Sequence, residues 1–240
     1  MEKIDRLWPD GFQFYFDDRL FQPGTDSFLL GAFPALRRGE VVCDLGGGTG
    51  LLGLLLLARQ PDLHVTEVEL QAAACDLCRR NIALNQLEER MECREADLRD
   101  LSQLKAGSFD LVVANPPYFS SESGYHAEND ARKNARTEIT CTLSDVISAA
   151  ARLLRWGGRF AVVFRTERLA ELLAECREAK LEPKRLRFIQ KNGVSAPSLL
   201  LLECRRGGNT GLRVEAPLLL QEADGSPTAE LDTIYFRDQR

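Results

Sequence analysis

The feature that most constrains this fold is a glycine-rich turn between an apolar strand and an apolar helix. The run VVCDL at 41–45 predicts a buried strand, and the residues near 50–59 predict a helix that begins directly after the glycines. The same order returns with a strand at 63–68 and a helix near 70–85. Such alternation is typical of βαβ units, whose parallel strands share one sheet. The sequence therefore predicts an α/β fold.

Later apolar runs extend this pattern along the chain. They predict five further strands, at 91–95, 109–114, 159–164, 184–190 and 198–204, and helices near 143–154 and 167–180. With the first two strands, these make seven in one sheet. We expect a seven-stranded, mostly parallel sheet with helices on both faces.

Both ends of the chain are expected to be additions to this core. Alternating aromatic and polar residues at 11–21 predict a short hairpin with a turn signal at Asp17 and Asp18, followed by a helix that Thr25 or Asp26 caps. The runs LRVEAPLLL and DTIYF predict a C-terminal hairpin or arm. We therefore expect one domain over residues 1–240, with an N-terminal hairpin and helix (1–40), a core (41–204) and a C-terminal arm (205–240).

The charge distribution narrows the possible partners. The formal net charge of −5 argues against a chain that is basic throughout, yet residues 131–206 contain 16 Lys and Arg against 8 Asp and Glu. A one-sided nucleic-acid-binding face has this composition, and solvated helix faces would produce it equally well. No stretch resembles a signal peptide or a membrane span. We expect a soluble, cytoplasmic protein without membrane partners.

The cysteines indicate neither a disulfide framework nor a metal site. There are seven, an odd number, and Cys75 and Cys78 form the only close pair. Zinc would need two more ligands at suitable spacing, and the chain has only His64 and His126. The sequence therefore predicts structural thiols and no metal.

The turn DLGGGTG indicates a ligand site. Four of the five residues from Gly46 to Gly50 are glycines, more than a simple turn needs. Glycine at 46, 48 and 50 lets the backbone pass close to a nucleotide-like ligand, next to Asp44 at the strand end. Gly48, Gly50 and Gly53 also satisfy G-x-G-x-x-G, which leaves a nicotinamide-dependent dehydrogenase as an alternative. That register leaves two glycines unused, so the D-L-G-x-G-x-G register fits better.

Two acidic residues follow the next strands. Glu69 comes 23 residues after Gly46, where a carboxylate can accept both hydroxyl protons of a ribose. Asp97 follows the third strand and by the same logic faces the amino group of an adenine. The alternative for both residues is an ordinary exposed acid, which in the case of Glu69 would favour a helix dipole.

The motif Asn115-Pro116-Pro117-Tyr118 is the most specific signal in the sequence. Its prolines remove backbone donors and hold the carbonyl groups in a rigid frame at a strand end. The Asn115 side-chain oxygen and the Pro116 carbonyl can each accept one hydrogen of a planar amino group, which localises the nitrogen lone pair. Tyr118 can stack on the planar acceptor. These roles predict a methyl-transfer site, and the polar residues 119–141 after it predict a substrate loop.

These features together resemble class I methyltransferases, and especially those that act on amino groups. The lead-in QPGTDSFLLGAF, the segment RRNIALNQL, and ARTE followed by LSDVISAARLLRWGGRFAVVFR are similar to the bacterial tRNA1(Val) adenine methyltransferase family. With these segments the resemblance spans most of the chain.

The resemblance implies a Rossmann-like class I methyltransferase fold in which the last of the seven strands is antiparallel. It implies that S-adenosylmethionine lies along residues 46–50, with Glu69 on the ribose, Asp97 near the adenine and Thr25 at the methionine end. Asn115 would then lie beside both cofactor and acceptor. The implied reaction is methylation of the 6-amino group of an adenine in tRNA, beside the anticodon.

The acceptor is the less certain part of this prediction. The NPPY motif is shared with enzymes that methylate a glutamine in release factors and with enzymes that methylate bases in DNA or rRNA. A protein glutamine or an rRNA base therefore stays open as the acceptor. The distant alternatives are the nicotinamide-dependent dehydrogenase and a non-catalytic RNA-binding module.

Overall fold

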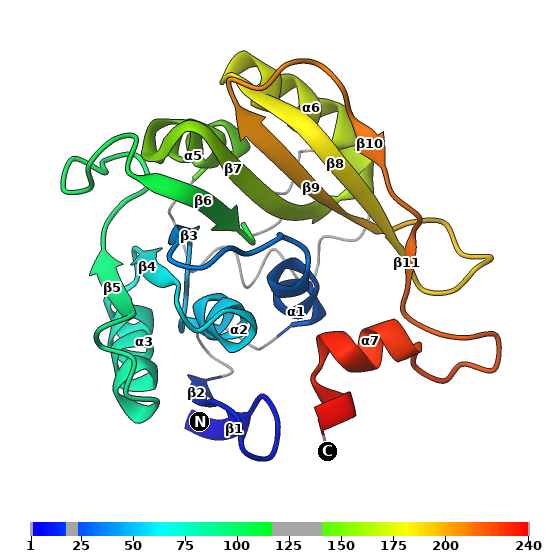
Figure 1. The fold of residues 1–240 in the computed structure, drawn as a ribbon, viewed down its shortest axis with the longest axis horizontal. Coiled ribbons are helices and arrows are strands. Elements are labelled where there is room, and N and C mark those ends of the chain that lie inside the picture. Colours follow the sequence, from blue (N-terminus) through cyan, green and yellow to red (C-terminus); the bar gives the residue numbers. More distant parts are fainter. Residues whose placement is uncertain (1, 18–23, 117–140, 240) are drawn as a thin grey trace, which may run out of the picture.

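A central β-sheet organises the computed structural model, which describes residues 2–17, 24–116 and 141–239. Its strands are β3 (Val41–Leu45), β4 (His64–Glu69), β5 (Met91–Glu95), β6 (Phe109–Ala114), β7 (Leu154–Arg165), β8 (Leu181–Gln190), β9 (Leu199–Arg206), β10 (Arg213–Val214) and β11 (Leu218–Leu219). The order is β10-β8-β9-β7-β6-β3-β4-β5, and β11 also pairs with β8 (Figure 1).

All seven predicted strands are present, from β3 to β9. Neighbouring strands from β5 through β7 pair in parallel, and β9 alone runs antiparallel, to β7 and β8. The predicted fold class is therefore confirmed. The strands β3 and β6 lie in the middle of the sheet, and they consist almost entirely of apolar residues because both of their faces are covered.

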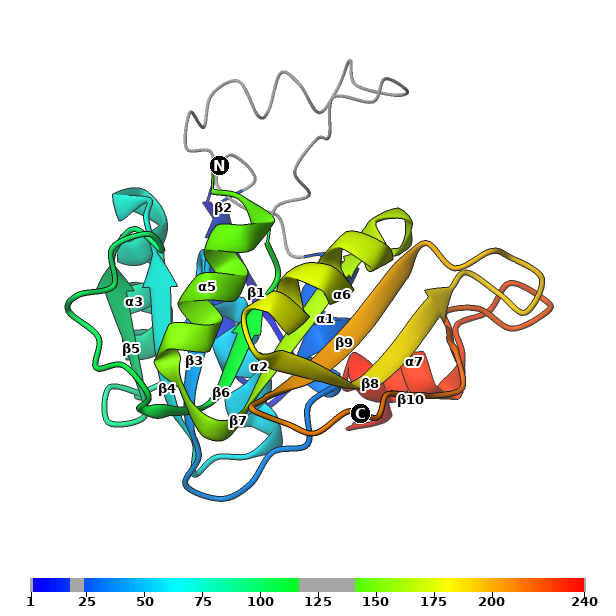
Figure 2. The same cartoon turned by 90° about the horizontal axis from the view of Figure 1, so that it is seen from above.

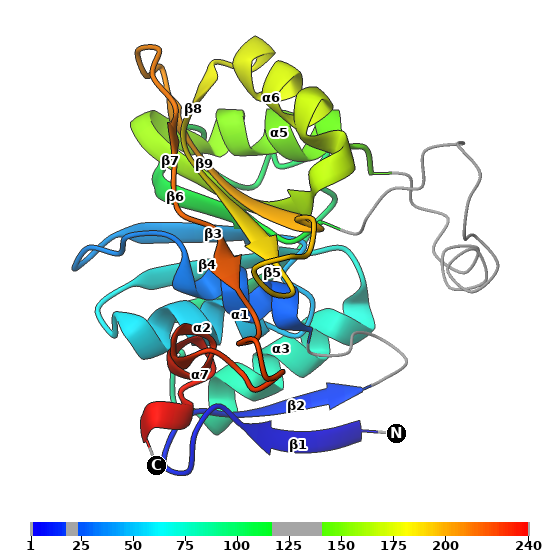
Figure 3. The same ribbon diagram turned by 90° about the vertical axis from the view of Figure 1, so that its right-hand side faces the viewer.

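Helices cover both faces of the sheet. They are α1 (Thr25–Ala32), α2 (Leu51–Arg59), α3 (Ala72–Leu84), α5 (Leu143–Leu153), α6 (Leu169–Glu178) and α7 (Ala229–Ile234), with short 3-10 helices η1 (Thr166–Arg168) and η2 (Arg237–Gln239). Figure 2 shows α5 and α6 side by side over one face. Figure 3 shows the remaining α-helices on the other face. Each face thus has its own apolar core.

The N-terminal hairpin exists, but its predicted position is wrong. β1 (Glu2–Arg6) pairs antiparallel with β2 (Gln13–Asp17), so the turn lies at residues 7–12 and Asp17 ends a strand. The turn closes through a hydrogen bond from the Leu7 N–H to the Phe12 carbonyl, 2.9 Å. The side chains of Asn81 on α3 and of Asn85, the C-cap of that helix, hold β2 by hydrogen bonds to its backbone. These partners lie about seventy residues away.

The predicted cap of α1 is also wrong. The N-cap is Gly24, without a side-chain hydrogen bond, and Thr25 is the first residue of the helix. The Thr25 hydroxyl is instead bonded to the Tyr235 hydroxyl, 3.0 Å away. A local capping pattern was overridden by a contact with the other end of the chain.

The C-terminal arm does not form a hairpin of its own. β10 and β11 each pair in parallel with β8, and the DTIYF segment enters α7. β8 would otherwise be an edge strand with unpaired backbone groups, and the two short strands cover that edge. The sheet therefore has nine strands, two more than predicted.

Candidate active site

The glycine-rich turn lies where the carboxyl ends of β3 and β4 meet. The N–H groups of Gly46 and Gly47 donate to the Val68 carbonyl, at 2.8 and 3.1 Å. Gly46 has φ of 79°, in the left-handed region that favours glycine. The turn is thus fixed to the end of β4, and α2 begins directly after it.

Glu69 lies beside this turn, as its place after β4 predicted. Its Oε2 accepts a hydrogen bond from the Gly48 N–H at 2.9 Å. Its Oε1 accepts from the Leu70 and Gln71 N–H groups at 3.0 and 2.8 Å. The residue is buried, with 8% of its surface exposed. Backbone donors thus orient this buried carboxylate at the carboxyl ends of the parallel strands, where it can bind a polar ligand.

Asp44 and Glu67 form a buried pair of acids beneath the turn. They are direct partners in the β3–β4 register, and both are buried. Burial raises the pKa of Asp44 to about 7, and burial together with the Asp44 charge holds the pKa of Glu67 well above its usual range. The pair therefore retains a proton near neutral pH. Among the described residues, Asp44 Oδ1 has no hydrogen-bond partner.

The Glu67 side chain explains why glycine occupies positions 47 and 53. A Cβ at Gly47 would lie 2.0 Å from Glu67 Oε2, and one at Gly53 would lie 2.0 Å from Oε1. Both positions therefore need glycine because the buried carboxyl lies against the backbone. The importance of Glu67 went unrecognised, although an acid in the middle of the apolar strand LHVTEV was the available signal.

Asn115 follows β6 and reaches the same cleft as the glycine turn. Its Nδ2 donates to Ser27 Oγ on α1 at 3.1 Å, and Ser27 is buried. The cleft is lined by both of these side chains together with Asp44, Leu51, Leu52 and the backbone of Gly46, Gly47 and Gly48. Because the amide nitrogen donates to Ser27, the Asn115 side-chain oxygen remains available to accept a hydrogen bond from a substrate amino group.

The other predicted site residues lie in four different places. Asp97 lies just beyond the end of β5, where its carboxylate pairs with Arg99 at 2.6 Å. Thr25 lies on α1, two residues before Ser27. Pro116 is buried next to Asn115. Pro117 and Tyr118, and the predicted substrate loop up to residue 140, lie outside the described residues.

All seven cysteines are free, and Cys75 and Cys78 are buried in α3. In the described ranges, no group of three or more His, Cys, Asp or Glu side chains could hold a metal ion. None of the helices in those ranges has the length and apolarity that a bilayer span requires.

Sequence comparison gives a consistent result. The family model for the methyltransferase small domain matches residues 16–179. A tRNA1(Val) (adenine(37)-N6)-methyltransferase of Porphyromonas gingivalis is 34% identical over 189 residues, which cover 76% of this chain and 73% of that protein. The protein of that name from Dickeya chrysanthemi is 33% identical over 195 residues, covering 80% and 76%.

Solved structures are similar in fold. A predicted O-methyltransferase from Agrobacterium tumefaciens superposes with a TM-score of 0.73 at 23% identity, covering 88% of this chain and 96% of that one. Geranyl diphosphate C-methyltransferase from Streptomyces coelicolor, solved with S-adenosyl-L-homocysteine, has a TM-score of 0.54 at 13% identity, covering 75% and 78%. At these identities the likeness shows the fold alone.

Proposed function

The chain belongs to the methyltransferase small domain family, and from that premise we propose that it transfers a methyl group from S-adenosylmethionine to the 6-amino group of an adenine in tRNA. The named activity of the relatives supports this substrate. The structural observation that carries the proposal is the shared cleft, in which Asn115 lies with the backbone of the glycine-rich turn.

The residues at the turn fit the cofactor. The unpartnered Asp44 oxygen suits a ligand that donates hydrogen bonds, and the glycines leave their backbone open to close approach. We assign Glu69 to the ribose hydroxyls, Asp97 to the adenine end and Thr25 to the methionine end. When bound, S-adenosylmethionine would supply a methyl group already activated by the positive sulfonium, so this chemistry needs no metal.

Asn115 has the central chemical role in this proposal. The lone pair of an adenine amino group is delocalised into the ring, so the nitrogen is a poor nucleophile. Asn115 Oδ1 and the Pro116 carbonyl would each accept one amino hydrogen, which favours a tetrahedral nitrogen whose lone pair faces the methyl group. Held in this way, the amino nitrogen would take the methyl group that the cofactor supplies, the cofactor would leave as S-adenosylhomocysteine, and the proton lost by the nitrogen would pass to water. Pro117 and Tyr118 are assigned to the frame and to stacking on the base.

The dehydrogenase alternative loses its main support. Its fingerprint required Gly53, and the structure gives Gly53 a different reason, the close approach of Glu67. No described feature favours a protein glutamine or an rRNA base over tRNA.

The test is direct. Purified protein is incubated with isotopically labelled S-adenosylmethionine and, in separate reactions, with tRNA, rRNA and release factors, and the products are analysed by mass spectrometry. We expect 6-methyladenosine in tRNA. Label in rRNA or on a release-factor glutamine, with none in tRNA, would replace the proposed acceptor while keeping the chemistry.

A further inference from the structure

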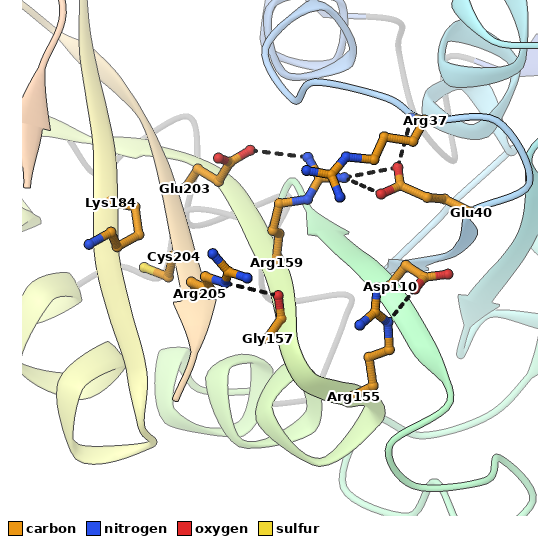
Figure 4. Close-up of a pocket in the computed structure, with 10 residues that line it drawn as sticks. All are labelled: Arg37, Glu40, Asp110, Arg155, Gly157, Arg159, Lys184, Glu203, Cys204 and Arg205. Atoms are coloured by element: carbon orange, nitrogen blue, oxygen red, sulfur yellow. Dashed lines mark hydrogen bonds and ion pairs between the residues drawn. The ribbon is translucent and has the colours of Figure 1, made fainter. Parts of the chain in front are cut away.

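A charged pocket lies at the edge of the sheet opposite the glycine turn. It has a volume of about 390 Å³ and is formed by β7, β8 and β9, the start of β6 and the loop before β3 (Figure 4). It shares no lining residue with the cleft around Asn115. Five of its side chains are basic and three are acidic, so it has a net charge of +2 in a chain whose net charge is −5.

The acidic side chains of the pocket already have partners. Glu40 binds Arg159 at 2.8 Å, Asp110 binds Arg155, and Glu203 lies 3.6 Å from Arg159. These pairs neutralise two of the five basic groups.

The remaining arginines of the pocket are not neutralised. Among the described residues, neither the Arg37 nor the Arg205 guanidinium has a carboxylate partner; the Arg37 backbone N–H donates to Glu40 at 2.9 Å, and the Arg205 guanidinium donates only to the Gly157 carbonyl, at 3.2 Å. Both residues are exposed, and Figure 4 shows Arg37 reaching toward the Arg159 guanidinium. Guanidinium groups that line one pocket without a carboxylate partner are suited to a phosphate group, which can accept several of their hydrogen bonds at once.

An exposed tryptophan adjoins the pocket. Trp156 lies between the lining residues Arg155 and Gly157, and 66% of its surface is exposed. A Cβ at Gly207 would lie 2.1 Å from its indole, so the glycine lets the ring pack against the backbone. An exposed indole can bind a nucleotide by stacking on its base, and this one belongs to the residue between two that line the pocket.

We propose that this pocket, with Trp156 at its rim, is a second nucleotide-binding site that takes a phosphate between Arg37 and Arg205 and a base on the indole. An RNA strand and a free nucleotide both offer this chemistry. The site is separate from the proposed methyl-transfer cleft, so its test does not depend on catalysis.

The test uses ligands without the adenine amino group. The full chain is titrated with labelled oligouridine, and unlabelled uridine monophosphate is used as competitor. Tryptophan fluorescence is recorded in parallel, and Trp156→Phe should remove the quenching. We expect Arg37→Ala and Arg205→Ala each to weaken binding by about tenfold, as loss of a charged hydrogen bond predicts.

Arg38→Ala is the matched control. Arg38 is next in the sequence, pairs with Asp62 at 2.8 Å and does not line the pocket, so its removal should change affinity less than twofold. Tighter binding of oligouridine identifies an RNA strand as the ligand, and tighter binding of the mononucleotide identifies a free nucleotide. Equal affinities for wild type, Arg37→Ala and Arg205→Ala, with S-adenosylmethionine binding retained, would overturn the proposal.

Discussion

At the scale of single residues, one hydrogen bond sets the orientation of Asn115. The sequence predicted that this side chain accepts amino hydrogens, because NPPY ends an apolar strand. It could not predict Ser27, which lies 88 positions away and meets Asn115 only when α1 packs on the sheet. Motifs identify the reacting groups, whereas the residues that orient them come from tertiary contacts.

Removing Ser27 should therefore impair the chemistry more than binding. Asn115→Ala is expected to lower kcat for tRNA methylation by roughly 10²–10³, because one preorganised acceptor is lost. Ser27→Ala should lower kcat by about tenfold, since the amide can then rotate away from the acceptor. Single-turnover rates and cofactor affinity, measured separately, test both changes.

Ser144→Ala provides the control, because Ser144 is an exposed residue of α5 and should leave both quantities unchanged. A Ser27→Ala enzyme with full turnover would show that the hydrogen bond has no orienting role. If cofactor affinity fell in parallel with kcat, Ser27 would instead belong to the cofactor site.

Glu67 should make stability depend on pH. Its folded pKa, like that of Asp44, lies above the unfolded value of about 4, so the native protein loses stability as pH rises from about 4 through the folded pKa, which is about 7 for Asp44. Glu67→Gln removes one of these groups. We expect the variant to gain roughly 2 kcal/mol relative to wild type between pH 4.5 and pH 7.5, or about 4–8 °C in Tm.

Thermal unfolding of both proteins across this pH range measures the difference. Glu88→Gln, at an exposed position, should follow wild type at every pH. A Tm difference between Glu67→Gln and wild type that does not change with pH would contradict the buried, protonated state of Glu67.

At the scale of elements, local sequence patterns determine the core strands and helices, whereas long-range contacts determine how the two terminal segments fold. The core strands and helices begin and end close to the predicted residues, because apolar runs and glycine turns specify them locally. The hairpin turn and the α1 cap were wrong, and the C-terminal arm has no hairpin of its own, because Asn81, Tyr235 and β8 determine these features from distant parts of the chain. The role of Gly53 likewise depends on another element, β4.

The packing of α2 on β4 should therefore be sensitive to one methyl group. In Gly53→Ala, the new Cβ would lie 2.0 Å from Glu67 Oε1 and 2.7 Å from Met91 Cε, so we expect a loss of about 1–3 kcal/mol. In a Glu67→Ala background the carboxyl is absent, and the same change should cost at least about 1 kcal/mol less. Chemical denaturation of the four proteins in this cycle measures the coupling.

Gly193→Ala serves as the reference, since a Cβ there would contact nothing within 4 Å. Purely additive effects of Gly53→Ala and Glu67→Ala would refute the steric explanation and return Gly53 to a role in ligand binding.

At the scale of the whole molecule, the C-terminal arm packs on the helix that supports the site. The Tyr235 ring stacks on Phe28 of α1 at a centroid distance of 4.4 Å, and its hydroxyl bonds to Thr25 at 3.0 Å. The same helix holds Ser27 against Asn115. The C-terminal arm thus contacts the helix that orients the Asn115 side chain. The sequence alone did not predict this contact.

Loss of the Tyr235 side chain should therefore affect both stability and turnover. Tyr235→Ala removes the ring stack and the hydroxyl, so we expect the free energy of unfolding to fall by about 1–2 kcal/mol. We also expect the single-turnover methylation rate to fall several-fold. Tyr235→Phe keeps the ring and should restore most of both. Glu222→Ala, an exposed change in the same arm, controls for nonspecific effects. If Tyr235→Ala lost stability but kept the full methylation rate, the arm would stabilise the sheet edge without influencing α1, and the connection from chain end to active site would fail.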